Sequence, residues 1–271
     1  MNIQSNKNIV YVTDKNISYI QFKKLLKYPE VVHAYTVDKN VDFKIASNHS
    51  KDKNFDTAIN NYKQLCSDLD LNFNNSIRAD LDHTDKFKIV NKIEEANFNI
   101  TDDKYDALIT NYSNVNLITT SSDCIVFLIY DPIKKVIANV HSGWRGVLQD
   151  IVIKTLKEMN DKYNCNYKDI IVCICPSIRK CHFEVDYDVY KMFEEKFNYD
   201  EIYEKKGNKW YIDTVKISKI KLLELGITEK NIIDSNICTV CNSKYINSYR
   251  TDKEKFKLNT AIISLREGED K

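Results

Sequence analysis

Residues 119–146 read TTSSDCIVFLIYDPIKKVIANVHSGWRG, and this stretch decides the fold. An apolar run follows Cys124, a turn signal stands at Asp131-Pro132, and a second apolar run ends at His141. Two short apolar runs around such a turn predict a β-hairpin. With a two-residue loop that begins at Pro132, Cys124 lies opposite His141, with Cβ atoms about 5 Å apart. The hairpin therefore brings a thiol and an imidazole together, provided that the register does not slip by one residue.

Apolar periodicity predicts that strands and helices alternate along the rest of the chain. Strands are expected at residues 9–13, 31–37, 105–110, 170–174, 245–250 and 261–265. Helices are expected at residues 56–69, 147–159, 186–197 and 217–225, the last of them ended by Gly226. Because the hairpin is antiparallel, the pattern favours an α+β fold over a purely parallel sheet. We expect residues 1–271 to form a single domain, a mixed β-sheet with helices packed on it in a layered sandwich.

Composition excludes several classes of protein. The chain has 40 Lys and Arg against 39 Asp and Glu, without a long basic block, which argues against nucleic-acid binding. No signal peptide or apolar run of membrane-spanning length is present, so no membrane association and a cytoplasmic location are expected. In that compartment the eight cysteines are expected to be reduced thiols or metal ligands rather than disulfides.

Several motifs point to one family. The segments SSDC at residues 121–124 and HSGWRG at residues 141–146 are similar to its TADC and HAGWRG signatures. Residues 105–110, YDALIT, resemble its ADALVT strand, and residues 175–185 resemble its GPSIGPCCYEV segment. Residues 237–239 and 247–250 are similar to its late CT and SYR signatures. The family is the multicopper polyphenol oxidase (laccase)-like family, also described as zinc-dependent purine nucleoside phosphorylases.

This resemblance implies a metal site with one cysteine and two histidine ligands. Cys124 and His141 match two of them, and the third belongs to a QVHG motif, for which His83 is the nearest candidate. His33 and His49 compete with it.

The chain departs from the family in three places. In the segment that resembles the family's early HAFTTR strand, the Arg and Gly of the family are missing after Tyr35-Thr36. The Gln and Gly of the QVHG motif are absent around His83. Residues 256–258 stand near the position of the family's C-terminal TGR element, which is lost. These departures bear most on how a substrate is bound.

Three protein ligands leave the fourth tetrahedral position of Zn²⁺ open for water, as in catalytic sites, and the same ligands also suit copper. A zinc-bound water with a pKa of about 7 is the nucleophile of zinc-dependent deamination. The resemblance implies phosphorolysis of adenosine, inosine and possibly methylthioadenosine, with adenosine deaminase as a companion activity. A purine nucleoside and phosphate are then the expected partners, and the oligomeric state is unknown.

Further residues near the motifs are candidates for the site. Arg145 and Arg179 are expected to bind phosphate or an anionic end of the substrate, together with Ser177 and Trp144. Arg145 also fits a surface charge, and Trp144 a core residue. Asp123 is a catalytic candidate that either orients a metal ligand or caps a turn.

Two other function classes are compatible with the pattern. One is a metal-free hydrolase with Cys124 as nucleophile and His141 as base. The other is a copper-binding redox protein of the polyphenol oxidase type. Separately, Cys238 and Cys241 form a CxxC motif. It is read as a structural thiol pair, with a Cys₄ zinc site that includes the cysteines at 173 and 175 as the alternative.

Overall fold

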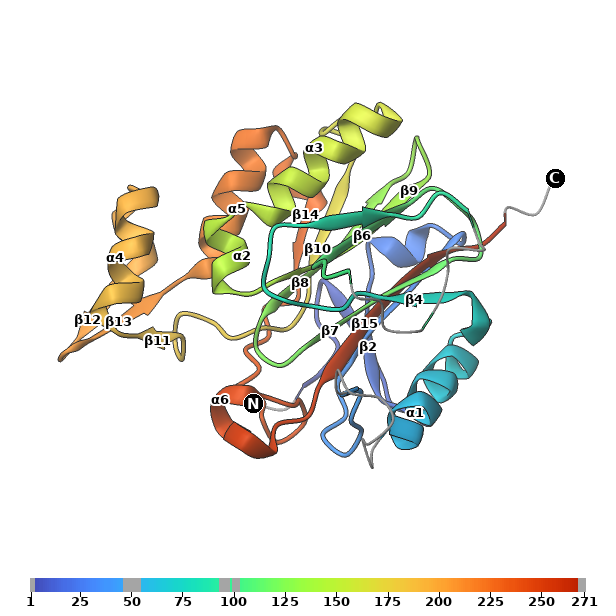
Figure 1. Ribbon diagram of the computed structural model, residues 1–271, viewed down its shortest axis with the longest axis horizontal. Coiled ribbons are helices and arrows are strands. Elements are labelled where there is room, and N and C mark those ends of the chain that lie inside the picture. The colour runs from blue at the N-terminus through green and yellow to red at the C-terminus, as the bar shows by residue number, and fades with distance from the viewer. Residues whose placement is uncertain (1–2, 46–54, 93–97, 99–102, 268–271) are drawn as a thin grey trace.

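The computed structural model describes residues 3–45, 55–92, 98 and 103–267 (Figure 1). Two six-stranded sheets form the centre of the molecule. In spatial order, the first sheet contains β1 (Ile9–Val12), β2 (Tyr19–Phe22), β3 (Val31–Thr36), β15 (Asn259–Leu265), β7 (Asn116–Ser121) and β4 (Ser76–Arg78). The second contains β14 (Ile232–Asp234), β10 (Ile171–Ile174), β8 (Ile125–Asp131), β9 (Val136–Ser142), β6 (Ala107–Thr110) and β5 (Phe87–Ile89).

Helices and a small third sheet complete the described part of the fold. The helices are α1 (Phe55–Asp68), α2 (Trp144–Leu148), α3 (Ile151–Tyr163), α4 (Tyr187–Lys196), α5 (Thr214–Leu225) and α6 (Tyr249–Asp252). The third sheet has the order β11 (Glu184–Val185), β13 (Lys209–Ile212), β12 (Tyr203–Lys206). Among the described residues, no helix is both long and apolar enough to cross a membrane.

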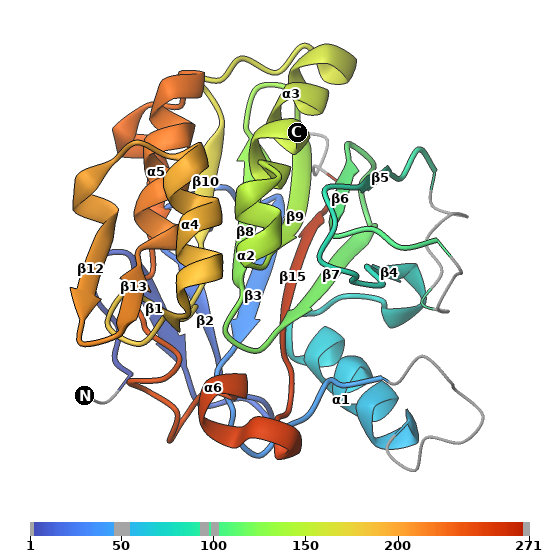
Figure 2. The ribbon, with the colours of Figure 1, turned by 60° about the vertical axis from the view of Figure 1, so that its left-hand side comes forward.

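The two large sheets pack face to face, with helices on their outer faces. Side chains of both sheets share one apolar core, which includes Phe22 and Tyr35 of the first sheet and Leu128 of the second. Helix α1 covers the outer face of the first sheet. Helices α2, α3 and α5 cover the outer face of the second, and Figure 2 shows them in front of β8, β9 and β10. The α+β class and the layered sandwich are confirmed, while the extent of the domain, residues 1–271, stays a prediction.

Burial on both faces explains the long apolar runs. Every residue of β8 and of β9 is buried, because one face packs on the first sheet and the other on the helices. A polar residue within such a run needs an internal partner. Asn139 of β9 has one in the other sheet, where its amide donates to the carbonyl oxygens of Leu117 and Ala261 at 2.9 and 3.0 Å.

The predicted hairpin forms, but the predicted register is wrong. Val126, not Cys124, pairs with His141, and Asp131 pairs with Val136. The loop is two residues longer than expected, because the Asp131 carboxylate accepts the backbone N–H groups of residues 133 and 134 at 2.8 and 2.9 Å. A shift of two residues, unlike a shift of one, preserves the alternation of faces. The Cys and His therefore still meet at the same end of the hairpin.

Two other predicted elements differ in the structure. The helix expected at residues 147–159 is split into α2 and α3 at Asp150, which has a φ of 59°. The strand expected at residues 245–250 is instead a turn followed by α6. There the Asn247 amide bonds to loop carbonyl groups at Asp38 and Val41, so its side chain replaces strand pairing as the connection to the fold.

Candidate metal centre

His83, Cys124 and His141 converge at one edge of the two sheets. His83 lies in the connection between β4 and β5, Cys124 directly precedes β8, and His141 is in β9. The His83 Nε2 and Cys124 Sγ atoms are 3.8 Å apart, and the two imidazole rings meet edge to face with centroids 5.1 Å apart. One donor atom from each of the three residues lies within 4.8 Å of the others. The structure therefore brings together the three residues that were predicted as ligands.

The competing histidines are not part of this group. His33 is fully buried in β3, where its Nε2 accepts the backbone N–H of Phe22 at 2.7 Å. His49 lies outside the described residues.

Asp106, directly before β6, connects two of the three candidate ligands. One carboxylate oxygen lies 2.8 Å from Nδ1 of His141 and also accepts the backbone N–H of His83 at 3.1 Å. The other accepts the backbone N–H of Thr84 at 2.7 Å and that of Asp82 at 3.3 Å. By engaging Nδ1, Asp106 leaves Nε2 of His141 free for a metal ion, as carboxylates beside metal-bound imidazoles commonly do.

Gly143 allows the ligands to approach one another. A Cβ atom at this position would lie 2.5 Å from Cδ2 of His83 and 3.2 Å from Sγ of Cys124. The first distance is shorter than any normal contact between carbon atoms. The glycine that follows His141-Ser142 is therefore required by space rather than by backbone conformation.

The neighbouring histidines favour the thiolate form of Cys124. Burial by itself would raise the pKa of Cys124, but the neighbouring His141 and His83 lower it to about 6. Burial would likewise lower the pKa of His141, whereas the Cys124 thiolate and the Asp106 carboxylate raise it to about 9. Two imidazoles beside a ready thiolate match the nitrogen and sulfur donors that zinc prefers, so the residues fit the ion.

A pocket of about 660 Å³ opens over the three donors. Its described lining is mainly apolar and aromatic, including Trp144, Phe183, Tyr249 and Phe256. This volume is within the usual range for sites that bind small molecules. The candidate metal centre is thus accessible to a ligand of nucleoside size.

Arg78 is a cation of the pocket that the sequence-based prediction missed. It is buried in β4, and its Nε has no hydrogen-bond partner among the described residues. Within the described residues its guanidinium makes one hydrogen bond, a long one of 3.4 Å from Nη1 to the carbonyl oxygen of Ala79. The hydroxyl groups of Ser122 and Ser142, which also line the pocket, are likewise buried and unpartnered in the described part of the chain. Buried polar groups without partners point to a polar ligand.

Of the residues predicted to bind substrate, three lie outside the described lining of the pocket. Trp144 lines the pocket, but Arg145, Ser177 and Arg179 are not among its described lining residues. Arg145 is exposed and stacks on the Trp144 ring, 4.3 Å from its centroid. Arg179 forms a two-pronged ion pair with Asp234, at 2.7 and 2.9 Å, so its guanidinium is already engaged.

The side chain of Asp123 fixes the turn that carries Cys124. Its carboxylate accepts the Thr239 hydroxyl at 2.5 Å and the Arg250 backbone N–H at 2.7 Å. Its φ of 88° is a left-handed conformation that is costly for a residue with a side chain. These contacts orient the turn that carries Cys124, and none of them reaches the two histidines.

Comparisons with known proteins identify the family of the chain. The model of the family described as multi-copper polyphenol oxidoreductase laccase matches residues 40–266. The chain belongs to this family.

Curated members of similar sequence carry the name purine nucleoside phosphorylase. The protein of that name from Aquifex aeolicus is 32% identical over 160 residues, 59% of this chain and 71% of that protein. Purine nucleoside phosphorylase LACC1 of Mus musculus is 28% identical over 216 residues, 76% of this chain but 47% of that protein. The chain therefore spans about half the length of the first curated relatives that it matches.

Solved structures share the fold. YlmD from Geobacillus stearothermophilus superimposes with a TM-score of 0.84 at 19% identity, covering 96% of this chain and all of that one. The hypothetical protein YfiH of Bacillus licheniformis gives a TM-score of 0.82 at 21% identity, covering 94% of this chain and 99% of that one.

Proposed function

We propose that this protein is a zinc-dependent purine nucleoside phosphorylase whose substrates are a purine nucleoside and phosphate. The observation that carries the proposal is the Cys/His₂ donor group at the base of a pocket large enough for a nucleoside. The names of the curated relatives supply the substrate class. His83, Cys124 and His141 would hold the metal ion.

A Zn²⁺ ion held by three protein ligands supplies a Lewis acid with one position left for substrate or water. The donors come from three separate segments, so the fold rather than one loop sets their spacing. Asp106 keeps Nε2 of His141 directed away from its own carboxylate and toward the other donors. It also fixes the backbone that carries His83.

Arg78 is our candidate for binding phosphate. It is a buried cation that lines the pocket, and most of its donors find no acceptor among the described residues. The other described arginine of the lining, Arg250, donates to the carbonyl oxygens of His182 and Glu184 at 3.0 and 3.1 Å. Since Arg250 is engaged in this way, Arg78 is the better partner for an anion.

Phosphorolysis joins a phosphate oxygen to C1′ of the ribose and breaks the bond from that carbon to the purine. The apolar and aromatic lining suits the purine, because aromatic faces stack well on bases. Where the family has its TGR element, this chain places Phe256 and Leu258 in the pocket lining. The chain therefore offers apolar surface there, and the positive charge for phosphate comes from Arg78 in β4.

Adenosine, inosine and methylthioadenosine are the nucleosides that we propose as substrates, with deamination of adenosine as a companion activity. The family resemblance supports this finer assignment. Copper suits the same three donors, so metal analysis of protein purified without added metal is the first measurement.

The deciding experiment incubates zinc-loaded protein with phosphate and either adenosine or inosine, and separates the products by chromatography. We expect free base and ribose-1-phosphate, and inosine from adenosine. Cys124→Ala should abolish turnover, whereas Cys66→Ala, a buried cysteine on α1, should not.

Two outcomes would contradict the proposal. Oxidation of phenols by the copper-loaded protein, without turnover of any nucleoside, would identify a redox protein. Hydrolytic activity that survives complete removal of metal and is lost in Cys124→Ala would identify a Cys–His hydrolase instead.

A further inference from the structure

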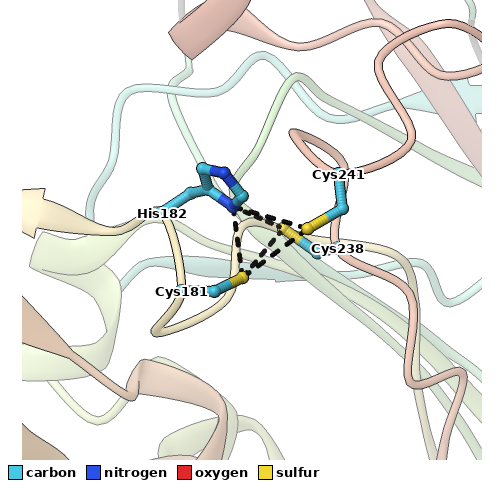
Figure 3. Close-up of side chains that lie close together, drawn as sticks. All are labelled: Cys181, His182, Cys238 and Cys241. Atoms are coloured by element: carbon cyan, nitrogen blue, oxygen red, sulfur yellow. Dashed lines mark hydrogen bonds between the residues drawn. The ribbon is translucent and has the colours of Figure 1, made fainter. Parts of the chain in front are cut away.

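A second group of candidate metal ligands lies in two loops, one of which is joined to Asp123 through Thr239. Cys181 and His182 lie in the connection between β10 and β11, and Cys238 and Cys241 lie in the turns that follow β14. Figure 3 shows the three sulfur atoms and the imidazole ring turned toward one common centre. Cys173 and Cys175, which the sequence-based alternative combined with Cys238 and Cys241, are not part of this group, because they are buried in the core between the two large sheets.

The distances within this group match a metal tetrahedron. For Zn–S bonds of about 2.3 Å and a Zn–N bond of about 2.0 Å, tetrahedral geometry gives S–S edges of roughly 3.8 Å and S–N edges of roughly 3.5 Å. Cys181 Sγ lies 3.6 Å from Cys238 Sγ and 3.8 Å from Cys241 Sγ. His182 Nδ1 lies 3.2, 3.7 and 3.5 Å from the sulfur atoms of residues 181, 238 and 241.

Disulfide bonding does not account for the arrangement. A disulfide requires two sulfur atoms about 2.05 Å apart, far below the separations observed. All eight cysteines of the chain are free thiols in this structure. Three thiols and an imidazole that share one centre are instead the donor set of a Cys₃His structural zinc site.

We propose that Cys181, His182, Cys238 and Cys241 bind a second Zn²⁺ ion, with no position left for substrate. Four protein ligands close the coordination shell, as in structural rather than catalytic zinc sites. The proposal goes beyond the phosphorylase function and does not depend on it, since it concerns only metal content and the two loops.

The position of this group indicates what a bound metal ion would do. Cys238 is bridged to Ser177, and Thr239 N donates to Ser177 O at 3.1 Å, so the two loops already lie side by side. The Thr239 hydroxyl then reaches Asp123, the residue before Cys124. Beyond His182, residues 183–185 line the pocket. An ion here would lock one wall of the pocket to the turn that carries the catalytic ligand.

Metal content tests the proposal directly. The full chain, expressed with zinc and desalted, should contain two zinc ions per chain by elemental analysis. Cys181→Ser and Cys241→Ser should each contain one, whereas Cys66→Ala should keep both. One zinc in the wild type that is retained in Cys241→Ser would overturn the second site. Phosphorolysis is assayed separately, so the two proposals can fail independently.

A spectroscopic measurement covers the case in which Cys181→Ser and Cys241→Ser do not fold, because it leaves the second site intact. In Cys124→Ala loaded with Co²⁺, only the second site would supply thiolates. We expect intense tetrahedral d–d bands and thiolate-to-cobalt charge transfer that disappear when Zn²⁺ is added. Absence of these bands, or a disulfide among residues 181, 238 and 241 by mass spectrometry of the untreated protein, would overturn the proposal.

Discussion

The space around Gly143 leads to a sharp prediction at the scale of single residues. Gly143→Ala places a methyl group 2.5 Å from the His83 ring, so the ring must move away from Cys124. We expect the variant to lose the metal ion of the His83–Cys124–His141 centre and all activity while its far-ultraviolet circular dichroism is unchanged.

Gly146→Ala is the matched control for this change. Its new methyl group would meet Ser142 and Ile151 at 3.1 and 3.2 Å but none of the three donors. It should retain metal by elemental analysis. Equal metal content in the two variants would show that the donors do not need the space at Gly143.

Arg78 carries the second prediction at this scale. Arg78→Met keeps an apolar stem and removes the charge, so the phosphate KM should rise about 10- to 100-fold, as expected from charge-assisted bonds worth roughly 1.5–3 kcal/mol. The KM for the nucleoside should change much less. Steady-state kinetics with phosphate as the varied substrate measures both.

Arg145→Met is the comparison for Arg78→Met, because Arg145 is one of the two cations that the sequence suggested. Its exposed guanidinium lies on Trp144 rather than among the described lining residues, so its loss should leave the phosphate KM within about twofold. If Arg145→Met raised the phosphate KM more than Arg78→Met, the anion would bind at the turn after β9 instead.

The chemistry of single residues was easier to predict than their partners. Cys124 and His141 could be chosen because they stand in recognisable motifs, and His83 because it is the nearest candidate for the histidine of the QVHG motif. Arg78 and Asp106 could not, because their roles depend on which backbone groups surround them after folding. For Asp106 the available signal was its place in residues 105–110, YDALIT, which resemble the family's ADALVT strand.

At the scale of elements, Asp106 joins the loop between β4 and β5 to strand β9. Asp106→Asn keeps the size of the side chain but removes the charge that orients His141 and accepts three backbone N–H groups around His83. We expect metal affinity to fall about 10- to 100-fold, the usual effect of losing such a partner. Competition with a chromophoric chelator measures the change.

Asp131→Asn provides the control at the other end of the same hairpin. Asp131 is also buried and also accepts backbone N–H groups, at residues 133 and 134. This variant should lower thermal stability without changing metal affinity. Equal losses of affinity would mean that Asp106 acts only through general stability.

The elements whose bounds were predicted best are those with a clear pattern of apolar and polar residues. The strand before Cys175 and the helix closed by Gly226, whose φ is 104°, lie within a few residues of their expected bounds. The hairpin register was missed because side-chain hydrogen bonds of Asp131 lengthen the turn. The break at Asp150 was missed because the apolar spacing continues across it.

At the scale of the whole molecule, burial of His33 within the first sheet makes stability depend on pH. Burial lowers the pKa of His33 to about 3, from an ordinary value near 6.5. Below pH 6.5 the unfolded chain binds a proton there and the folded chain does not, so stability falls as the pH falls. The loss approaches about 5 kcal/mol near pH 3.

His33→Gln should remove this part of the acid sensitivity, because the amide does not titrate and still offers an oxygen to the Phe22 N–H. Urea unfolding of both proteins between pH 7 and pH 4 measures the difference, with the wild type losing stability faster. Parallel curves for the two proteins would contradict the assignment.

The position of β15 also affects how the protein is made. This strand, residues 259–265, is inserted between β3 and β7, and both neighbours precede it by more than a hundred residues. At about 5–20 residues per second, a ribosome needs roughly 10 to 45 seconds to pass from the end of β3 to the start of β15. Until β15 is made, β3 has an open edge, and so does β7 once it has been made; other chains can pair with these edges. A nascent chain is therefore most exposed to aggregation until β15 emerges.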